Sequence, residues 1–457
     1  MWFRRDLRLS DHPALGAAVA SAQEVVPLFV IDPRLWDGAG QARRRYLVDS
    51  LGHLNASMDG ALVVRRGDPV HVVAAVTRET AASTVHVSAD FGPYGAARDR
   101  AVENALADTG VDLVRSGSPY AVSPGRVRKG DGTPYRVYSP FYRAWASHGW
   151  RAPATTPASI PWATGVPSDA IPTADRHPPD AQVSQPQTSP PQLPGAGEEA
   201  AWARWQHFRE TALDDYADDR NRPDLDGSSR LSVHLKYGEL HPRTLLAELG
   251  DSKAHEVFRK ELAWREFYAD VLHHLPDTGS NYLRPEFARM PYDGGPQADQ
   301  RLEAWQHGRT GYPVVDAGMR QLLAEGWMHN RVRMIVASFL VKDLHLEWQV
   351  GARWFMRHLV DGDIATNSHG WQWTAGCGTD ASPYYRIFNP ITQGLRFDPD
   401  GDYVRRYVPE LRHLDGPAVH EPWNVADGYA ADYPERIVDH AAERVESLAR
   451  YALIKKE

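Results

Sequence analysis

The segment that begins at Asp361 gathers side chains that could hold and serve a redox cofactor. It contains a second acid at Asp363, an amide at Asn367, and two indoles at Trp371 and Trp373. Buried acids and amides need fixed partners, because an unpaired polar group inside a core is costly. Such groups beside tryptophans suit a large, polar, redox-active ligand with an aromatic path for electrons next to it.

A second set of reactive side chains lies on one face of a predicted helix. Glu261, Trp264, Arg265 and Tyr268 stand at i, i+3, i+4 and i+7, so one helix face presents them together. An acid beside an indole and a guanidinium is unusual for a plain core face. The alternative is an exposed Glu–Arg pair one helical turn apart.

A third set is the hydroxyl-rich stretch Ser-Ser-Arg-Leu-Ser at 228–232, which follows an Asp-Gly turn. Hydroxyls and free backbone N–H groups after such a turn can bind a diphosphate at a helix N-terminus. The same pattern is typical of an ordinary serine-rich helix cap, and the residues alone leave both interpretations open.

The elements that must position these groups differ between the two halves of the chain. Short apolar runs alternate with amphipathic stretches over 1–125, which predicts a parallel α/β sheet. Only Met1, Trp2 and Phe3 remain for the first strand. Either this strand is short or the start of the sequence is misassigned. No G-x-G-x-x-G follows it, which argues against a nicotinamide-type site. The predicted strands lie within 25–32, 62–68, 84–88 and 111–114, and predicted helices include 42–58 and 96–109.

From about residue 198 the apolar period is helical. The stretch 151–197 is rich in Pro, Ala, Ser and Thr, and it reads as a connector that wraps the surface. We therefore expect an α/β N-terminal domain with a parallel, Rossmann-like sheet over 1–125, a Pro-rich connector over 126–197, and an all-α C-terminal domain over 198–457. The expected helices are 200–216, 241–250, 253–275, 314–325, 328–344, 348–360 and a charged last segment, 430–457.

Composition excludes several classes of function. With 51 basic and 59 acidic residues the net charge is −8, so any contact with nucleic acid needs a local basic patch. Cys377 is the single cysteine, which excludes an intrachain disulfide and disfavours a metal site. H-E-x-x-H, Walker and G-x-S-x-G motifs are absent. Without a long apolar run, we expect a soluble, cytoplasmic protein.

These motifs, with W-M-H-N-R-V-R-M at 327–334 and E-L-A-W-R-E-F-Y at 261–268, resemble the DNA photolyase/cryptochrome flavoprotein family. The resemblance runs from W-F-R-R-D-L near the start to about Pro409. Within the family it points to class I cyclobutane pyrimidine dimer photolyases. It implies an all-α FAD-binding domain with noncovalent FAD, and light-driven repair of UV-damaged DNA by electron transfer from excited reduced FAD. Photolyases are a known example of enzymes that act on flipped bases.

The resemblance also implies roles for individual residues. Glu261 would hydrogen-bond the damaged base and Trp264 would stack on it, in a lesion pocket completed by Asn330, Met334 and Trp373. The FAD-binding set would be Tyr216, Ser228, Ser229, Arg230, Leu231, Ser232, Arg333, Asp361, Gly362, Asp363 and Asn367. Electrons would pass along Trp371, Trp348 and Tyr292. DNA contacts would come from Arg220, Arg265, Arg331, Arg386 and Gln393.

The third member of the electron relay departs from the family pattern. Relatives usually carry a tryptophan about ten residues before the position of Trp305, and Gly295 occupies that spacing here. Tyr292 takes the place if three residues are inserted, and Trp354 is another candidate branch. A tyrosine can donate an electron if it also loses its proton.

The residue types in the lesion pocket favour one substrate among the family's substrates. (6-4) photolyases place histidines at the positions of Asn330 and Met334, and plant cryptochromes carry an acid at the position of Asn367. The amide and thioether found here favour cyclobutane dimers. A cryptochrome-like blue-light photoreceptor, a (6-4) photolyase and a DNA-binding flavoprotein without catalysis are the alternatives.

An antenna chromophore is the last expectation that the resemblance carries. The loop 89–99 resembles the family's P-Y-G-x-x-R-D loop, and folate-type relatives have a Glu where Gly95 and Ala96 stand. This favours 8-hydroxy-5-deazaflavin, or no antenna, over methenyltetrahydrofolate. We expect a monomer that binds UV-damaged DNA, and so associates with the nucleoid, and that uses neither a membrane nor a metal.

Overall fold

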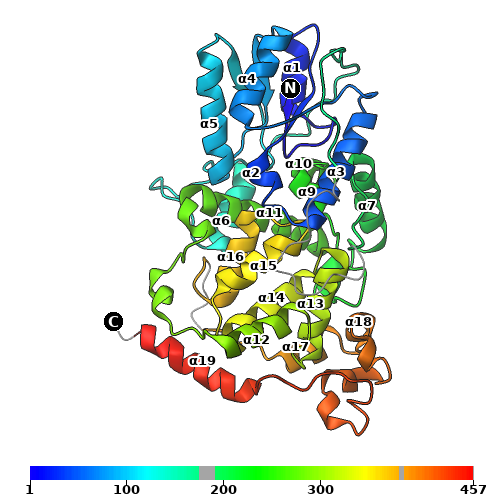
Figure 1. Cartoon of the computed structure of the whole chain (residues 1–457), viewed down its shortest axis with the longest axis vertical. Coiled ribbons are helices and arrows are strands. Elements are labelled where there is room, and N and C mark those ends of the chain that lie inside the picture. The colour runs from blue at the N-terminus through cyan, green and yellow to red at the C-terminus, as the bar shows by residue number, and fades with distance from the viewer. Residues whose placement is uncertain (174–190, 380–384, 456–457) are drawn as a thin grey trace.

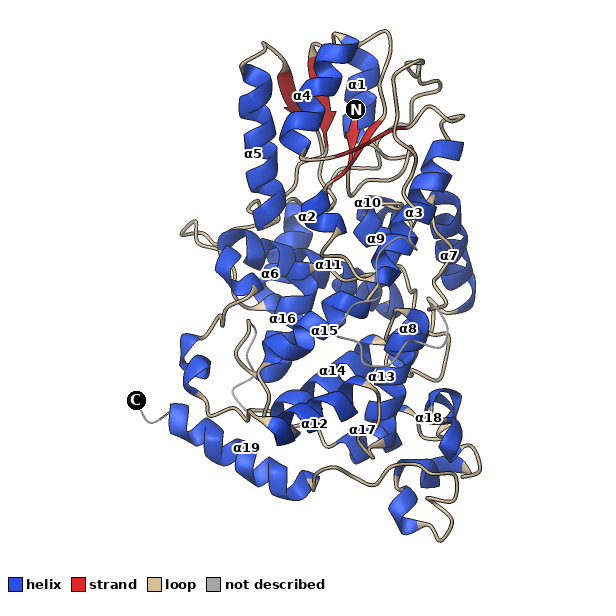
Figure 2. Ribbon diagram, viewed as in Figure 1, coloured by secondary structure: helices blue, strands red, loops and turns tan. Residues whose placement is uncertain are grey.

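The computed structural model describes residues 1–173, 191–379 and 385–455. An α/β part at the N-terminal end stands on a larger helical part, and the chain ends on the far side of the helical part (Figure 1). Strands occur in the α/β part, whereas the rest of the described chain is helices and loops (Figure 2). The predicted combination of an α/β and an all-α region is confirmed.

Strands and helices alternate in the α/β part, as the sequence predicts. β1, β2 and β3 pair in parallel in that order, and β4 pairs in parallel with β5. Proline is the first residue of α1, α2, α4 and α5, where its missing N–H would be unpaired in any case and its fixed φ suits a helix. The strands are β1 Trp2–Phe3, β2 Leu28–Ile31, β3 Val63–Arg66, β4 Thr84–Val87 and β5 Asp112–Arg115. The helices are α1 Pro13–Ser21, α2 Pro33–Trp36, α3 Gln41–Ala56, α4 Pro69–Thr80 and α5 Pro93–Ala107.

Residues 168–169 of the expected connector lie along the open edge of the first sheet. The backbone N–H of Val64 in β3 donates to Ser168 Oγ at 2.9 Å, and Asp169 N–H donates to the Val64 carbonyl at 2.8 Å. These bonds cover an edge that would otherwise expose unpaired groups. The range expected as connector also contains α6 (Tyr138–His148), which packs in the helical core through the buried Trp145.

The helical part contains the predicted helices with three main differences. The last predicted segment, 430–457, is helical only over His440–Ile454 in the described chain. The stretch 200–216 is two helices, because α7 ends at Thr211 and the chain turns before α8 begins at Tyr216. The stretch 328–344 is α14 followed by a π-helical turn, η4 Phe339–Asp343. The α-helices are α7 Glu198–Thr211, α8 Tyr216–Asp219, α9 Ser232–Tyr237, α10 Pro242–Ala247, α11 Lys253–His274, α12 Pro296–Gln306, α13 Pro313–Glu325, α14 Asn330–Ser338, α15 Trp348–His358, α16 Ile364–Ala375, α17 Pro390–Phe397, α18 Asp402–Tyr407 and α19 His440–Ile454. Short 3-10 turns are η2 Pro276–Gly279, η3 Pro285–Arg289, η5 Pro409–Leu411, η6 Gly416–His420 and η7 Pro422–Asn424.

Buried polar contacts join the two parts. The carboxylate of Glu239, which is fully buried just after α9, accepts hydrogen bonds from Tyr46 Oη at 2.7 Å and Ser50 Oγ at 2.5 Å on α3. Gly197 N–H and His234 Nδ1 also meet it, each at 2.7 Å. One carboxylate therefore satisfies groups from both parts and from the start of α7.

Glu239→Ala should lower the free energy of unfolding by at least about 3 kcal/mol, because several buried donors would lose their acceptor at once and each unpaired group costs about 1–3 kcal/mol. Denaturant unfolding followed by circular dichroism measures this. Glu79→Ala is the matched control, since Glu79 makes only an exposed pair with Arg65 and should change stability by less than about 1 kcal/mol. Equal effects of the two substitutions would contradict the role given to Glu239.

Candidate functional site

A cavity of about 470 Å³ lies in the helical part and is lined by residues from 216 to 374 together with Arg5. It collects most of the residues that the sequence predicted for a cofactor and for a lesion. The predicted residues that line it are Tyr216, Arg220, Ser229, Leu231, Ser232, Glu261, Trp264, Arg265, Asn330, Arg331, Arg333, Met334, Asp361, Gly362, Asp363, Asn367, Trp371 and Trp373.

Other predicted residues lie outside that lining. The guanidinium of Arg230 lies 4.5 Å over the ring of Trp327 and pairs with Glu325 at 3.3 Å, so it is turned away from the cavity. Ser228 does not line the cavity, and its backbone carbonyl accepts a hydrogen bond from Arg204 Nη2 at 2.7 Å. Trp348 and Tyr292 belong to the aromatic cluster described below. Arg386 is exposed and follows soon after residues 380–384, which lie outside the described chain. Gln393 is half-buried on α17.

Asp361 presents an unsatisfied carboxylate oxygen at this cavity. Its Oδ2 pairs with Arg333 Nη2 at 2.8 Å, and the side chain is only 3 % exposed. Its Oδ1 is buried and meets no hydrogen-bond donor among the described residues. Buried carboxylate oxygens are normally hydrogen-bonded, so this atom fits a donor on a ligand, such as a ring N–H or a ribose hydroxyl.

Asp363 organises the same wall from the N-terminus of α16. Its Oδ1 accepts from the first backbone N–H groups of the helix at 3.0 and 3.2 Å, while its Oδ2 pairs with Arg5 at 2.7 Å. Burial would raise the pKa of Asp363, but the nearby positive charges, above all that of Arg5, outweigh burial and lower it. The carboxylate is therefore ionised and held in place before any ligand arrives.

Asn367 lies one helical turn further along α16. Its Nδ2 donates to the carbonyl of Ala352 on α15 at 3.0 Å, which fixes the orientation of the amide. Because the carbonyl can only accept, the amide oxygen is left as an acceptor for an N–H group in the cavity. This arrangement suits a heterocyclic ring with an edge N–H.

Among the residues predicted for the lesion, Glu261 forms an ion pair of 2.7 Å with Arg220. Burial raises the pKa of Glu261, and the charges of Arg220 and Arg331 reduce that rise without cancelling it. The carboxyl can thus change between proton donor and acceptor when its partner moves. Trp264 stacks on Tyr138 with 3.6 Å between ring centroids and 8° between planes, so one of its faces is already covered.

The basic residues predicted for DNA differ in how free they are. Arg265 donates to the carbonyls of Pro119 and Leu235 at 2.9 and 3.0 Å and lies over the ring of Tyr120, so its guanidinium is used inside the protein. Arg331 donates to Asn221 Oδ1 at 2.8 Å and lies over Phe397 at the cavity rim. Arg331 and Arg220 are therefore better placed than Arg265 to meet a phosphate.

Two of the predicted relay tryptophans lie on neighbouring helices. Trp371 on α16 packs over Gly351 on α15, where a Cβ atom would overlap the indole ring. Trp348, the first residue of α15, is 1 % exposed. The ring that contacts Trp348 is Tyr282, which sequence spacing did not single out, because it lies in an irregular segment between η2 and η3.

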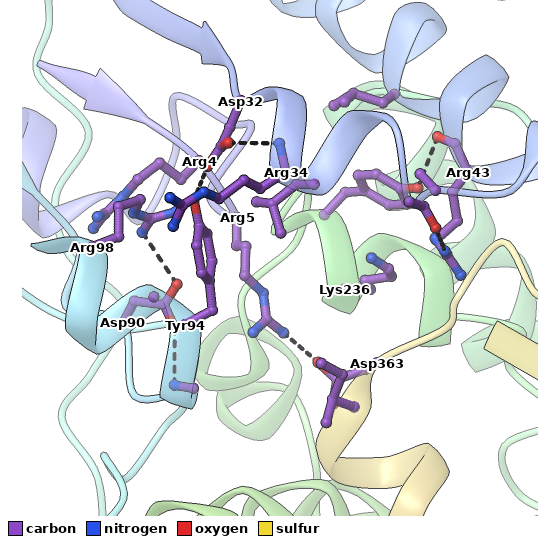
Figure 3. Close-up of a pocket in the computed structure, with 18 of the residues that line it drawn as sticks. Arg4, Arg5, Asp32, Arg34, Arg43, Asp90, Tyr94, Arg98, Lys236 and Asp363 are labelled. Atoms are coloured by element: carbon purple, nitrogen blue, oxygen red, sulfur yellow. Dashed lines mark hydrogen bonds and ion pairs between the residues drawn. The ribbon is translucent and has the colours of Figure 1, made fainter. Parts of the chain in front are cut away.

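A second cavity, of about 400 Å³, lies where the α/β part meets the helical part. Cationic and aromatic side chains dominate its lining, and Figure 3 shows several arginines around it with Lys236 and Asp363 at one side. The predicted loop 89–99 supplies Asp90 and Tyr94, and Asp90 pairs with Arg98 at 3.3 Å. Sequence patterns pointed to this loop, but they assigned no ligand contacts in the cavity to individual residues.

The two cavities share one wall. Arg5, Lys236, Gly362 and Asp363 line both of them. Burial and the charges of Arg43 and Arg5 lower the pKa of Lys236 to about 7, so this ammonium loses its proton readily when no anion is near. The wall therefore carries the paired charges of Arg5 and Asp363, together with a lysine whose positive charge an anionic ligand would favour.

Neither a metal site nor a membrane span is present in the part of the chain that the structure describes. No three His, Cys, Asp or Glu side chains there come together as metal ligands. No helix there combines the length and apolar character needed to cross a bilayer.

Comparisons with known proteins show which family this chain is similar to. Residues 1–159 match the family model "DNA photolyase", and residues 258–453 match "FAD binding domain of DNA photolyase". The chain is 41 % identical over 453 residues to a deoxyribodipyrimidine photo-lyase of Streptomyces griseus, covering 97 % of this chain and 96 % of that protein.

Solved structures of similar proteins share the whole fold. A class III photolyase of Agrobacterium tumefaciens has a TM-score of 0.90 at 38 % identity and covers 100 % of this chain and 97 % of its own. A cryptochrome of Synechocystis sp. scores 0.88 at 27 % identity over 98 % of both chains. An archaeal photolyase of Sulfolobus tokodaii with two FAD molecules scores 0.85 at 26 % identity over 99 % of both chains.

Arg220→Gln should raise the pKa of Glu261 further, because removing the neighbouring positive charge favours the neutral carboxyl while burial is unchanged. The protonated carboxyl band in infrared difference spectra, assigned by its loss in Glu261→Gln, should then persist to higher pH. Arg209→Gln removes a distant surface arginine and serves as the control. The coupling would be refuted if the band had the same pH dependence in the unaltered protein, in Arg220→Gln and in Arg209→Gln.

Proposed function

The chain belongs to the DNA photolyase family, and from that premise we propose that it repairs cyclobutane pyrimidine dimers in UV-damaged DNA by light-driven electron transfer from reduced FAD. One observation carries the proposal. Acceptors suited to a redox ring and groups suited to a damaged base line the same cavity. Donor and lesion would then be close enough for direct electron transfer.

The residues of this cavity fit a noncovalently bound FAD. The free oxygen of Asp361 and the amide oxygen of Asn367 would accept from the ring or the ribose, with Arg333 holding Asp361 in place. Ser229 and Ser232, near the start of α9, would donate to the diphosphate. The remaining predicted cofactor contacts are Tyr216, Leu231, Gly362 and Asp363, with Ser228 and Arg230 supporting the loop from outside.

When bound, reduced and excited by light, FAD supplies the electron that opens the cyclobutane ring and takes it back afterwards. The chain's own part is to bind, orient and hold a proton. Glu261 would hydrogen-bond a carbonyl of the dimer, and its raised pKa lets it do so as a neutral donor. Trp264 and Trp373 would form walls of the lesion pocket, with Asn330 and Met334 between them.

The lesion must leave the DNA stack to enter this cavity, and photolyases are known to flip it. Arg220 and Arg331 at the rim would bind the phosphates that flank it, and exposed Arg386 with Gln393 would extend the contact. These side chains offer local positive charge on a chain whose net charge is −8. We propose Arg265 as a residue that positions the pocket, because its donors are used by backbone carbonyls.

The state of the histidine next to Asn330 in the sequence favours a cyclobutane dimer over a (6-4) product. His329 precedes Asn330, and its Nδ1 accepts from the backbone N–H of Arg331 at 3.2 Å. Burial and the charge of Arg331 lower its pKa to about 3, so it stays neutral and cannot serve as a proton donor. The class I assignment stays a prediction beside the similar class III structure.

The second cavity would hold an antenna chromophore. Its arginines and aromatic rings suit a flat anion, and a side chain at Gly95 would have to displace the carboxylate of Asp90. A glutamate of the folate type at that position would therefore have to move Asp90 away from its partner Arg98. This supports 8-hydroxy-5-deazaflavin over methenyltetrahydrofolate. The archaeal relative with two FAD molecules makes a second flavin the other candidate.

The proposed repair is tested with Glu261→Ala. This variant should retain FAD but repair a thymine-dimer oligonucleotide about tenfold less efficiently or worse, since leaving a buried carbonyl of the dimer without its hydrogen bond costs about 1–3 kcal/mol. Dimer loss in light by chemically reduced protein is the measurement, with a dark control. Glu256→Ala changes an acid earlier on α11 that pairs with Arg259 outside the cavity, and it should repair normally.

Repair that is absent in the unaltered protein, with flavin bound, would overturn the proposal. Restored (6-4) products would then indicate the related photolyase. Absence of both repairs would favour a cryptochrome-like photoreceptor.

The antenna is tested by adding each chromophore separately to the purified protein. After gel filtration, the absorption of 8-hydroxy-5-deazaflavin should remain with the protein and that of methenyltetrahydrofolate should not. Retention of folate alone would contradict the assignment. An FAD content near two per chain would point to a second flavin instead.

A further inference from the structure

The aromatic ring that contacts Trp348 is Tyr282. Its ring centroid lies 6.1 Å from that of Trp348, with the planes at 87°. Tyr292, which sequence spacing proposed as the third relay member, stacks on Tyr282 instead, at 6.5 Å and 19°. The path from Trp348 to Tyr292 therefore passes through Tyr282.

Tyr282 also has an acceptor for its proton. Its hydroxyl donates to Glu347 Oε1 at 3.2 Å. Glu347 immediately precedes Trp348 and is exposed to solvent, so a proton that it accepts can pass on to water. Burial raises the pKa of Tyr282, which keeps the phenol protonated until it is oxidised.

The relay tryptophans have no comparable acceptor. The indole Nε1 atoms of Trp371 and Trp348 are buried and meet no hydrogen-bond partner within the described residues. An oxidised indole that finds no base keeps its proton and its positive charge. It then remains a strong oxidant toward the next ring. Tyr282 combines ring contact with a proton acceptor, which both indoles lack.

We propose that Tyr282 donates an electron to oxidised Trp348 while Glu347 accepts the phenolic proton. This inference rests on the proposed function, because the first oxidant is a photoexcited oxidised flavin in the neighbouring cavity, acting through Trp371. One electron passes from Tyr282 to the Trp348 radical cation, which becomes neutral indole. The phenolic O–H bond breaks and a carboxyl O–H bond forms. The products are a neutral tyrosyl radical and a neutral carboxyl group.

The step explains how a relay with tyrosine at its outer end can work. Reversal requires both the electron and the proton to return, so proton loss to water delays recombination. Tyr292 stacks on Tyr282 and therefore contacts the ring that would carry the radical. A tryptophan at the third position would not need Glu347, whereas a tyrosine does, because oxidation without loss of the proton is less favourable.

Transient absorption and electron paramagnetic resonance of the flavin-loaded protein test the proposal. After a light pulse, the unaltered protein should form a tyrosyl radical as the Trp348 radical decays, and heavy water should slow that decay. Tyr282→Phe should lose the tyrosyl signal and prolong the tryptophan radical. Glu347→Gln keeps the ring of Tyr282 but should lower the tyrosyl yield and remove the dependence on heavy water.

Tyr142→Phe is the matched control, because Tyr142 also donates to a glutamate, Glu256, at 2.7 Å but contacts neither relay tryptophan. Its signals should equal those of the unaltered protein. Tyr292→Phe should still show decay of the Trp348 radical at the normal rate. Flavin absorption of each variant checks that the fold and cofactor are retained.

An undiminished tyrosyl signal in Tyr282→Phe, or unaltered kinetics in Glu347→Gln, would overturn the inference. So would loss of the signal in Tyr292→Phe or Trp354→Phe with normal kinetics in Tyr282→Phe, since another ring would then be the donor. Dimer repair by chemically reduced, unaltered protein is scored separately. It can fail without affecting the radical measurements, so failure of the proposed function is distinguishable from failure of the relay.

Discussion

The ion pair between Arg5 and Asp363 is the contact on which both cavities depend. It joins the first turn of chain after β1 to the N-terminus of α16, which carries Asn367, Trp371 and Trp373. Because Asp363 also caps α16, one carboxylate sets the start of the helix and its position against the α/β part. Arg5 and Asp363 belong to the wall between the cavities, so the same pair separates the two ligands proposed for them.

Positive charge is concentrated at particular sites, although the net charge of the chain is negative. The chain is acidic overall, yet arginines line both cavities and the rim of the larger one. Where such a cation is paired inside the protein, as Arg265 is, it shapes the pocket. Arg220 is partly exposed and pairs with Glu261, so the proposed phosphate contact of Arg220 would be linked to the protonation of Glu261. We therefore expect a polyanion to be attracted by local groups of arginines and not by the net charge of the chain.

The polar partners of the tryptophans distinguish packing residues from the proposed electron carriers. Trp145 and Trp205 donate their indole N–H to Glu266 and Glu248, as buried indoles usually do. The relay tryptophans leave this group without a protein partner in the described chain. A missing hydrogen bond would be a cost in a purely structural role, and it has a use in a residue that must be oxidised without losing its proton.

Local spacing determined much of this protein from its sequence. The 3.6-residue period predicted α11 and α13 closely, and it placed Glu261 and Trp264 on one face, since both depend only on neighbours along the chain. The alternation of strands and helices predicted the parallel sheet, including a first strand that proves to be short. Motif resemblance then indicated the family, which the comparisons confirmed.

Only the tertiary structure decided how distant segments meet. Arg230 turns away from the cavity because Trp327 and Glu325 lie beside it, and Arg265 is occupied by carbonyls far along the chain. Tyr282 lies in an irregular segment without periodicity, so no pattern could place it against Trp348. The second cavity forms where the α/β part packs on the helical part. The periodicity of a sequence shows which residues share one face of a helix or strand. Which other element packs against that face depends on the tertiary structure, and the spacing of residues does not show it.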